Sequence, residues 1–329
     1  MRVAVLSASD RASKQAAETA LRRLRDSDAG VAVREDLEPP GADLIVAIGD
    51  NRFLLDVLPE VRAGTQILAV GHGFLAEVAP DAISGAISRV LAKKHTVEER
   101  LRLEVQVKGR KFPPAMNEVA LTTSRGGGFL RYSLEVDGEV VWRDAGDGVV
   151  ISTPTGSTGY GLSAGGPVVM ENAETIVIVP VCSASGKRPL VVPRSSNVAI
   201  TDIESRLGRD IVLDGRRRIR VRESGFSVRE SSNPARFVRV GKTRYLQVFG
   251  KLQARTGTSA LPPDAAPSAK FVFRLLGDQG ALSEKQLVSE SGLPERTVRS
   301  ALSYLVKRDL VRRAPSLRDA REAVFAIRR

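Results

Sequence analysis

Residues able to bind or transform a ligand are densest between positions 146 and 167. The apolar run 149–151 is followed there by hydroxyl side chains and glycines: Ser152, Thr153, Thr155, Ser157, Thr158, Ser163, Gly156, Gly159, Gly161, Gly165 and Gly166. Hydroxyls both donate and accept hydrogen bonds, and glycines let a ligand come close to the backbone. The segment therefore predicts a site for a polyhydroxylated, phosphorylated ligand such as a nucleotide. The alternative is an ordinary loop rich in Gly, Ser and Thr.

Two further places carry polar residues beside apolar runs. Gly49-Asp50 follows the continuous apolar run 44–48, and Asn117-Glu118 precedes another apolar stretch. A carboxylate at the carboxyl end of a buried parallel strand faces the crevice where α/β proteins bind ligands. Asp50 could equally cap the helix that follows it. An amide beside a carboxylate can satisfy base edges and ribose hydroxyls, or it can be a plain polar pair at a strand start.

These segments together resemble the NAD kinase family, the enzymes that phosphorylate NAD to NADP. The segment 146–167 is similar to the family's nucleotide-binding signature, and other elements match at Gly49-Asp50, Gly73-Phe74-Leu75, Asn117-Glu118, 180–182, 188–193 and Asp214-Gly215. The resemblance extends over residues 1 to about 255 and is strongest from 96 to 195. Where the family has Gly-Gly-Asp-Gly-Thr, this chain has Ile48-Gly49-Asp50-Asn51-Arg52.

The resemblance implies a set of site residues. Asp50 is the catalytic residue, acting on the ribose hydroxyl of NAD that receives the phosphoryl group. The residues implied to bind NAD are Gly49, Asp50, Asn117, Glu118, Asp147, Thr155, Ser157, Thr158 and Tyr160. It also implies Mg²⁺ with ATP or polyphosphate as the phosphoryl donor, and a homo-oligomer.

Two residues at the altered motif are expected to contact phosphate. Asn51 can adopt the left-handed conformation that the family's glycine provides. Arg52 offers a guanidinium, which suits phosphate oxygens, where the family has threonine.

Bulk composition limits the class of protein. The chain has 329 residues, 42% of them hydrophobic and 27% charged, and a formal net charge of +12. That charge favours polyanionic partners such as nucleotides, polyphosphate or nucleic acid. No apolar run approaches the roughly 20 residues of a membrane span. One cysteine and two histidines argue against disulfides and a structural zinc site, so we expect a cytoplasmic protein with no metal held by side chains alone.

The pattern along the chain predicts several domains. Residues 1–95 alternate apolar runs with helical stretches, which favours a Rossmann-like α/β nucleotide-binding domain. Residues 96–235 contain strand patterns, including 100–107, and predict a β-rich domain. The family resemblance implies that this domain is a β-sandwich that binds NAD. Residues 236–255 are expected to return to the first domain, as the family resemblance implies, and 256–268 read as a linker. Arginines 216–218, with Arg220 and Arg222, are either a solvated strand face or a phosphate-attracting patch.

Residues 269–329 predict a small winged helix-turn-helix-like domain: helix, helix, turn, helix and hairpin. From Lys270 to Arg329 there are 13 Lys/Arg and 7 Asp/Glu, a net charge of 13 − 7 = +6. The residues expected to contact DNA are Arg296, Thr297, Arg299, Arg312 and Arg313. A module used for dimerisation, or one that covers the core, is the alternative.

Two functions are consistent with these features. The first is an NAD kinase that transfers a phosphoryl group from ATP or polyphosphate to the 2′-hydroxyl of NAD. The alternative is a catalytically retired NAD kinase fold acting as an NAD(P)-sensing transcriptional regulator that binds DNA through the C-terminal module.

Overall fold

The computed structural model describes residues 1–27, 32–34, 41–124, 129–241, 265–279, 282–315 and 323–327. The chain divides into two compact units, Met1–Lys242 and Thr243–Arg329. No helix in the described ranges is both long enough and apolar enough to cross a membrane.

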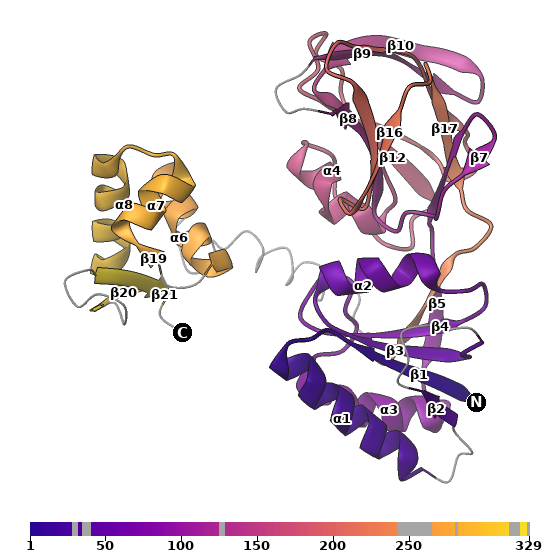
Figure 1. Cartoon of the computed structure of the whole chain (residues 1–329), viewed down its shortest axis with the longest axis vertical. Helices are drawn as coiled ribbons and strands as arrows, with labels where there is room; N and C mark the ends of the chain where they lie inside the picture. Colours follow the sequence, from indigo (N-terminus) through magenta and orange to yellow (C-terminus); the bar gives the residue numbers. More distant parts are fainter. Residues whose placement is uncertain are drawn as a thin grey trace. The chain divides into compact units, whose positions relative to one another are not determined.

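A six-stranded, mostly parallel sheet forms the first half of the N-terminal unit (Figure 1). Its order is β2-β1-β3-β4-β18-β5. The strands are β1 (Arg2–Ser7), β2 (Ala32–Arg34), β3 (Leu44–Ile48), β4 (Gln66–Val70), β5 (Thr96–Arg100) and β18 (Ala235–Arg239). All five residues of β3 are buried, as a continuous apolar run predicts for a strand covered on both faces.

Helices cover both faces of this sheet. Helices α1 (Arg11–Arg25) and α3 (Ile83–Leu91) pack on one face, and α2 (Asn51–Val57) packs on the other (Figure 1). The short turns η1 (Leu58–Glu60) and η2 (Pro80–Ala82) follow α2 and precede α3. Ala16, Ala20 and Leu24 are the buried stripe of α1, at the spacing that brings helical residues onto one face. The predicted α/β layers are therefore present.

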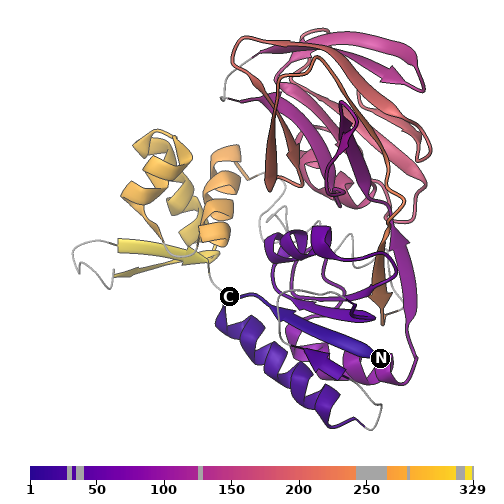
Figure 2. The same ribbon diagram turned by 45° about the vertical axis from the view of Figure 1, so that its right-hand side comes forward.

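The second half of the N-terminal unit is a sandwich of two sheets (Figure 2). One has the order β10-β9-β14-β17-β6-β7, with β6 (Leu103–Val107), β7 (Arg110–Lys111), β9 (Leu130–Val136), β10 (Glu139–Gly146), β14 (Val198–Ser205) and β17 (Phe226–Glu230). The other has the order β13-β12-β11-β8-β15-β16, with β8 (Glu118–Thr123), β11 (Gly148–Ser152), β12 (Thr175–Val181), β13 (Leu190–Pro193), β15 (Arg209–Leu213) and β16 (Arg217–Val221). Their facing side chains form one apolar core.

Asp-Gly pairs make the hairpin turns that the sequence predicts. Asp137 and Gly138, between β9 and β10, both have positive φ (52° and 86°), and so do Asp214 and Gly215 between β15 and β16 (53° and 64°). Two successive positive φ values define the turn whose twist matches that of the flanking strands. Two short helical turns, η3 (Thr155–Thr158) and α4 (Tyr160–Ser163), follow β11.

Two predicted boundaries need correction. Strand β5 pairs with β18 in the first sheet, so the sandwich begins after Arg100 and not at residue 96. The alternating run 100–107 is likewise divided, because Arg100 ends β5 and Leu103 starts β6. The segment predicted to return, 236–255, overlaps β18, which lies between β4 and β5. Residues 242–255, and residues 256–264 of the predicted linker, lie outside the described residues.

The C-terminal unit contains three helices and a three-stranded antiparallel sheet within its described ranges. The helices are α6 (Pro267–Gln279), α7 (Glu284–Ser291) and α8 (Glu295–Lys307), and the sheet has the order β19-β21-β20, with β19 (Leu282–Ser283), β20 (Val311–Pro315) and β21 (Ala323–Ile327). Ser283 caps α7 through a capping box with Gln286. Gly292, with φ of 63°, ends α7 before the turn into α8. The predicted order of elements is present.

Candidate active site

Asp50 lies at the carboxyl end of β3 and is the N-cap of α2. Its side chain accepts a hydrogen bond from the backbone N–H of Phe53, with a 2.9 Å distance from N to Oδ1. The residue is exposed. The capping role is thus present, and it occupies only one of the two carboxylate oxygens. The other oxygen makes no hydrogen bond to the described residues and remains available to a ligand in the crevice.

The loops after β3 and β4 interlock beside Asp50. A Cβ atom on Gly71 would lie 2.1 Å from the carbonyl oxygen of Gly49, and one on Gly73 would lie 2.1 Å from Oδ1 of Asn51. That same Asn51 oxygen accepts a hydrogen bond from the N–H of Leu75 at 3.1 Å. The side chain of Asn51 therefore ties the two loops together.

This geometry changes the interpretation of the altered motif. Asn51 begins α2 and is not among the residues with positive φ, so the expected left-handed conformation is wrong. The side chain that we expected to contact phosphate has an internal partner instead. Arg52 is exposed on the first turn of α2, where its guanidinium can reach solvent or a ligand.

Asp214 fixes the start of β8, where Asn117 and Glu118 lie. Its carboxylate accepts hydrogen bonds from three successive backbone N–H groups: Met116 at 2.9 Å, Asn117 at 2.6 Å and Glu118 at 3.1 Å. Burial raises the pKa of this carboxyl, and the three donors and the charge of Arg102 oppose the rise. We did not predict this role from the sequence, although the Asp-Gly turn marked the position.

The signature segment packs directly against the same strand start. A Cβ on Gly156 would lie 2.0 Å from the carbonyl oxygen of Asn117, so only glycine permits this approach. Thr153 donates to the carbonyl of Met116 at 2.8 Å and accepts from the N–H of Gly156 at 3.0 Å. The first hydroxyls of the segment therefore shape the backbone.

Two of the predicted ligand-binding hydroxyls also have internal partners. Ser157 is 1% exposed, lies within hydrogen-bond distance of the carbonyl of Pro154 at 2.6 Å, and accepts from the N–H of Val169 at 3.0 Å. Thr158 donates to the carbonyl of Thr155 at 3.2 Å. These contacts hold η3 in place.

A second polar group gathers around Tyr160, which is 40% exposed. Burial, followed by the charges of Asp147, Cys182 and Glu118, raises the pKa of the tyrosine. The Cys182 thiol donates to Asp147, which raises the pKa of the thiol. Cys182 is exposed. The Glu118 carboxylate is buried. Its Oε2 lies 3.1 Å from the position that a Cβ on Gly159 would occupy.

The two halves of the N-terminal unit meet at Arg102. This arginine is 1% exposed, and it donates to the carbonyl of Asn233 at 2.6 Å and to that of Leu58, at the end of α2, at 3.0 Å. Burial lowers the pKa of Arg102 to about 10, and the charge of Asp214 opposes the change. The chain crosses between the two halves here, so this contact sets how α2 lies relative to the sandwich.

A buried ion-pair network makes a second junction between the halves. Arg100 of β5 and Arg239 of β18 both pair with Glu98 and Glu171, and Arg239 also pairs with Glu77. The five side chains are 3–13% exposed. Glu171 follows the signature segment, and its Oε2 lies 3.0 Å from Nη2 of Arg100. The network thus attaches that segment to the first sheet.

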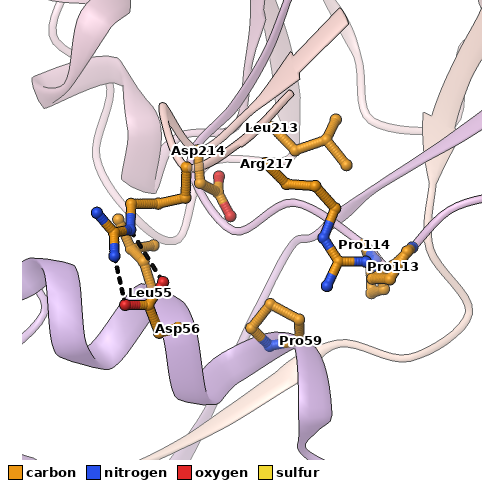
Figure 3. A pocket seen from close by; sticks show the side chains of 9 residues that line it. Leu55, Asp56, Pro59, Pro113, Pro114, Leu213, Asp214 and Arg217 are labelled. Atoms are coloured by element: carbon orange, nitrogen blue, oxygen red, sulfur yellow. Dashed lines mark hydrogen bonds and ion pairs between the residues drawn. The ribbon is translucent and has the colours of Figure 1, made fainter. Parts of the chain in front are cut away.

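A pocket of about 400 Å³ lies between α2 and the β15–β16 hairpin (Figure 3). Asp56 and Pro59 line one side, and Asp214 and Arg217 line the other. Arg216, which stands where the family has glutamine, binds Asp56 through two hydrogen bonds of 2.9 and 2.5 Å. Asp56 and, from farther away, Asp50 raise the pKa of Arg216. The charge of Arg216 is therefore balanced by Asp56, and this ion pair connects the hairpin to α2.

The candidate DNA-contacting residues lie on the C-terminal unit. Arg296, Arg312 and Arg313 are exposed, and Thr297 is half-buried. Arg299 lies 2.9 Å from a carboxylate oxygen of Glu284 and 2.5 Å from one of Glu295. Its charge is therefore balanced within the unit, a pairing that the sequence did not indicate.

Known proteins resemble this chain in sequence. A family model described as the ATP-NAD kinase C-terminal domain matches residues 116–240. The NAD kinases of Thermococcus gammatolerans and Thermococcus sibiricus are 35% and 38% identical over 225 and 227 residues. Each match covers 67% of this chain and 81% of the relative.

Solved structures agree with these matches. An NAD kinase from Archaeoglobus fulgidus, in complex with ATP, superposes with a TM-score of 0.65 at 26% identity, covering 77% of this chain and 99% of that one. Yeast NADH kinase in complex with NADH has a TM-score of 0.66 at 22% identity, with 77% and 87% covered, a likeness of fold alone. The α/β half, the sandwich and the polar groups between them define a two-part nucleotide-binding fold. With relatives above 30% identity over 81% of their length, the chain belongs to the NAD kinase family.

Proposed function

We propose that this chain is an NAD kinase, a phosphotransferase that moves a phosphoryl group from ATP or polyphosphate to the 2′-hydroxyl of NAD and so makes NADP. The main support is its 35–38% identity to NAD kinases over 81% of their length. Since those relatives are named as kinases, they favour catalysis over the alternative of a retired, NAD(P)-sensing regulator.

Asp50 is the residue to which we assign the chemistry. A general base must come within hydrogen-bond reach of the proton that it removes. The Asp50 oxygen that does not cap α2 is exposed at the carboxyl end of β3, where α/β folds bind their ligands. It would orient the ribose hydroxyl and accept its proton as the new P–O bond forms and the terminal P–O bond of the donor breaks, releasing ADP or the shortened polyphosphate. Gly49 lets the backbone before Asp50 pack closely against the ring of Phe53, because a Cβ at residue 49 would lie 2.7 Å from that ring.

The group around Tyr160 is our candidate site for the adenosine part of NAD. Its half-exposed ring offers a stacking surface, and the Asp147 and Glu118 carboxylates can accept from ribose hydroxyls. Asn117 contributes an amide at the start of β8. Thr155, Ser157 and Thr158 would act mainly by holding the η3 backbone against β8.

The phosphoryl donor is expected to bring Mg²⁺ with it. The described residues contain no group of three or more His, Cys, Asp or Glu that could hold a metal ion. Mg²⁺ is usually bound by one or two carboxylates together with substrate phosphates, and it supplies charge neutralisation for phosphoryl transfer. Arg52, at the first turn of α2, is the nearest candidate among the altered motif residues for contact with those phosphates.

The test is NADP formation by the full-length protein with NAD, Mg²⁺ and either ATP or polyphosphate, beside Asp50→Asn. Turnover by the wild type that is lost in the variant supports the assignment. Dinucleotide binding without turnover with either donor would reject the kinase and restore the regulator.

We further propose that the C-terminal unit is a winged helix that binds DNA. The pairing β19-β21-β20 beside α7 and α8, with the exposed Arg296, Arg312 and Arg313, supports this. In full-length protein, replacing these three by Ala should weaken DNA binding and flatten its salt dependence. Arg299→Ala is the matched control with a smaller effect, because Arg299 already has two carboxylate partners. Equal loss in the control would contradict the assignment.

Two broader proposals accompany these. We propose a cytoplasmic protein, in keeping with its single, exposed cysteine, and a homo-oligomer. Light scattering of the full chain at two concentrations measures its oligomeric state directly.

A further inference from the structure

Segment 206–222 is the most strongly basic stretch of the N-terminal unit's surface. It contains seven arginines and two carboxylates, Asp210 and Asp214. The two carboxylates are buried, at 1% and 8% exposure. The surface of the segment therefore displays almost only positive charge.

The strand β16 organises these arginines. It is an edge strand of its sheet, and alternate residues of a strand share one face at a separation of about 6.8 Å. Arg218 and Arg220 share such a face and are 58% and 66% exposed. Ile219 and Val221, on the other face, pack against the sandwich core.

A single buried carboxylate holds both exposed arginines. Oδ1 of Asp210 accepts from Nε of Arg220 at 2.6 Å, and Oδ2 accepts from Nη1 of Arg218 at 3.2 Å. Ser124 donates to Oδ1 at 2.7 Å. Two guanidinium charges facing one carboxylate leave a net charge of +1, and both arginine side chains are more than half exposed. Arginines fixed in this way are preorganised for bidentate binding of phosphate.

The same arginines lead from one pocket to another. At one end of the hairpin, Arg216 and Arg217 line the 400 Å³ pocket beside α2 together with Asp56 and Asp214. These two arginines face Asp56 and Glu60 at 2.5 and 4.0 Å. At the other end, a pocket of about 350 Å³ is lined by Ser124, Arg206, Leu207, Gly208 and Arg220, and none of these described residues is acidic. Arginines thus occur at both ends of β16 and along it, with acidic neighbours in the lining only at the α2 end.

We propose that the β15–β16 hairpin binds a linear chain of phosphates, inorganic polyphosphate, along β16 from the pocket beside α2 to the pocket around Arg206. Its role as the route of a phosphoryl donor rests on the proposed kinase function, whereas the binding itself does not. Segment 206–222 contains no aromatic residue, and single-stranded nucleic acid is usually held by stacking of its bases on aromatic rings. The surface therefore fits a chain of phosphates without bases.

The test measures binding of medium-chain inorganic polyphosphate to the full-length protein over a range of salt concentrations. In Arg218→Gln/Arg220→Gln we expect affinity to fall at least about tenfold, and the slope of log K against log salt to decrease by about 1.4, the value for two lost contacts to a single chain. Arg131→Gln/Arg143→Gln is the matched control. It removes the same charge from exposed positions on β9 and β10, and its affinity should stay within about twofold.

A second variant guards against misfolding, because the first leaves Asp210 without its arginine partners. Arg206→Gln/Arg222→Gln removes two exposed arginines and keeps the Asp210 contacts; it should weaken polyphosphate binding about three- to tenfold. The proposal is overturned if both variants bind polyphosphate as tightly as the wild type. It is also overturned if single-stranded DNA competes for the site better than unlabelled polyphosphate does, when the two competitors are compared at equal concentrations of phosphate groups.

Measuring NADP formation distinguishes a failure of this binding proposal from a failure of the proposed kinase function. NADP formation with ATP should be unchanged in all these variants. If the wild type makes no NADP but its polyphosphate binding depends on these arginines, the binding surface stands and the kinase assignment fails.

Discussion

Asp50 caps α2, and we have proposed that it also acts as the catalytic base; substitutions can separate the two roles. Asparagine caps helices about as well as aspartate. Asp50→Asn should therefore keep the hydrogen bond from Phe53 and change the free energy of unfolding by less than about 0.5 kcal/mol. The amide cannot accept a proton, so NADP formation should fall by about 10²- to 10⁴-fold. That loss corresponds to about 2.7–5.5 kcal/mol in the activation barrier.

Asp50→Ala removes the cap as well. We expect the same loss of turnover together with about 1 kcal/mol of destabilisation, which lowers the melting temperature of a unit of this size by roughly 2–4 °C. Asp10 supplies a matched control, because it caps α1 by accepting from the N–H of Ser13 at 3.0 Å. Asp10→Ala should show a similar loss of stability with turnover retained.

The assays are NADP formation under saturating substrates and thermal unfolding followed by circular dichroism. If Asp50→Asn turns over within about tenfold of the wild type, Asp50 is not the base. If Asp10→Ala lost turnover as completely as Asp50→Ala, the effect of Asp50 would reduce to helix capping, and the separation of roles drawn from its two oxygens would be refuted.

Four further substitutions test how individual contacts stabilise the N-terminal unit. Asp214→Asn places an amide N–H₂ against one of three backbone N–H donors. The free energy of unfolding, measured in urea, should fall by about 2 kcal/mol, and the KM for NAD should rise. Burial pushes the pKa of Asp210 upward, but hydrogen bonds from Ser124, Arg218 and Arg220 outweigh it and lower the pKa below the usual 3.8. Its stabilisation is therefore complete above that pH and lost as the pH falls below it, so acid titrations of Asp210→Asn should show a smaller drop in stability there. Gly156→Ala, whose Cβ would lie 2.0 Å from a carbonyl oxygen, should lower the free energy of unfolding by at least about 3 kcal/mol. Gly85→Ala is its control: it lies in α3, where a Cβ would have nothing within 4 Å, and it should raise the free energy of unfolding by about 0.5–1 kcal/mol.

Local patterns predicted the elements whose causes are local. The apolar run 44–48 became β3 with those bounds, and α8 (Glu295–Lys307) is the helix predicted after the turn in the C-terminal module. Both follow from periodicity and from end signals within a few residues. The Asp-Gly turns were predictable because positive φ at two successive positions selects those residue types.

Pairing between distant segments could not be predicted in this way. Strand β5 joins the first sheet because β18, more than a hundred residues later, provides its partner. The three N–H donors to Asp214 lie almost a hundred residues from it, and the partners of Arg299 include Glu284 on a neighbouring helix. A sequence shows which groups can donate or accept, but the fold decides which of them meet.

The altered motif at residues 48–52 illustrates the same distinction. Isoleucine in place of the family's first glycine suggests a side chain in the way of phosphates. In the structure Ile48 is fully buried and packs with the helices on the α1 and α3 face of the sheet, so its side chain points away from the loop surface. Gly49 remains necessary, because a Cβ there would strike the ring of Phe53. The next departure, Asn51, has acquired a bond to the loop after β4. The altered motif therefore has a side-chain link between two loops where the family has glycine. Asp50 remains exposed, as its proposed role as the base requires.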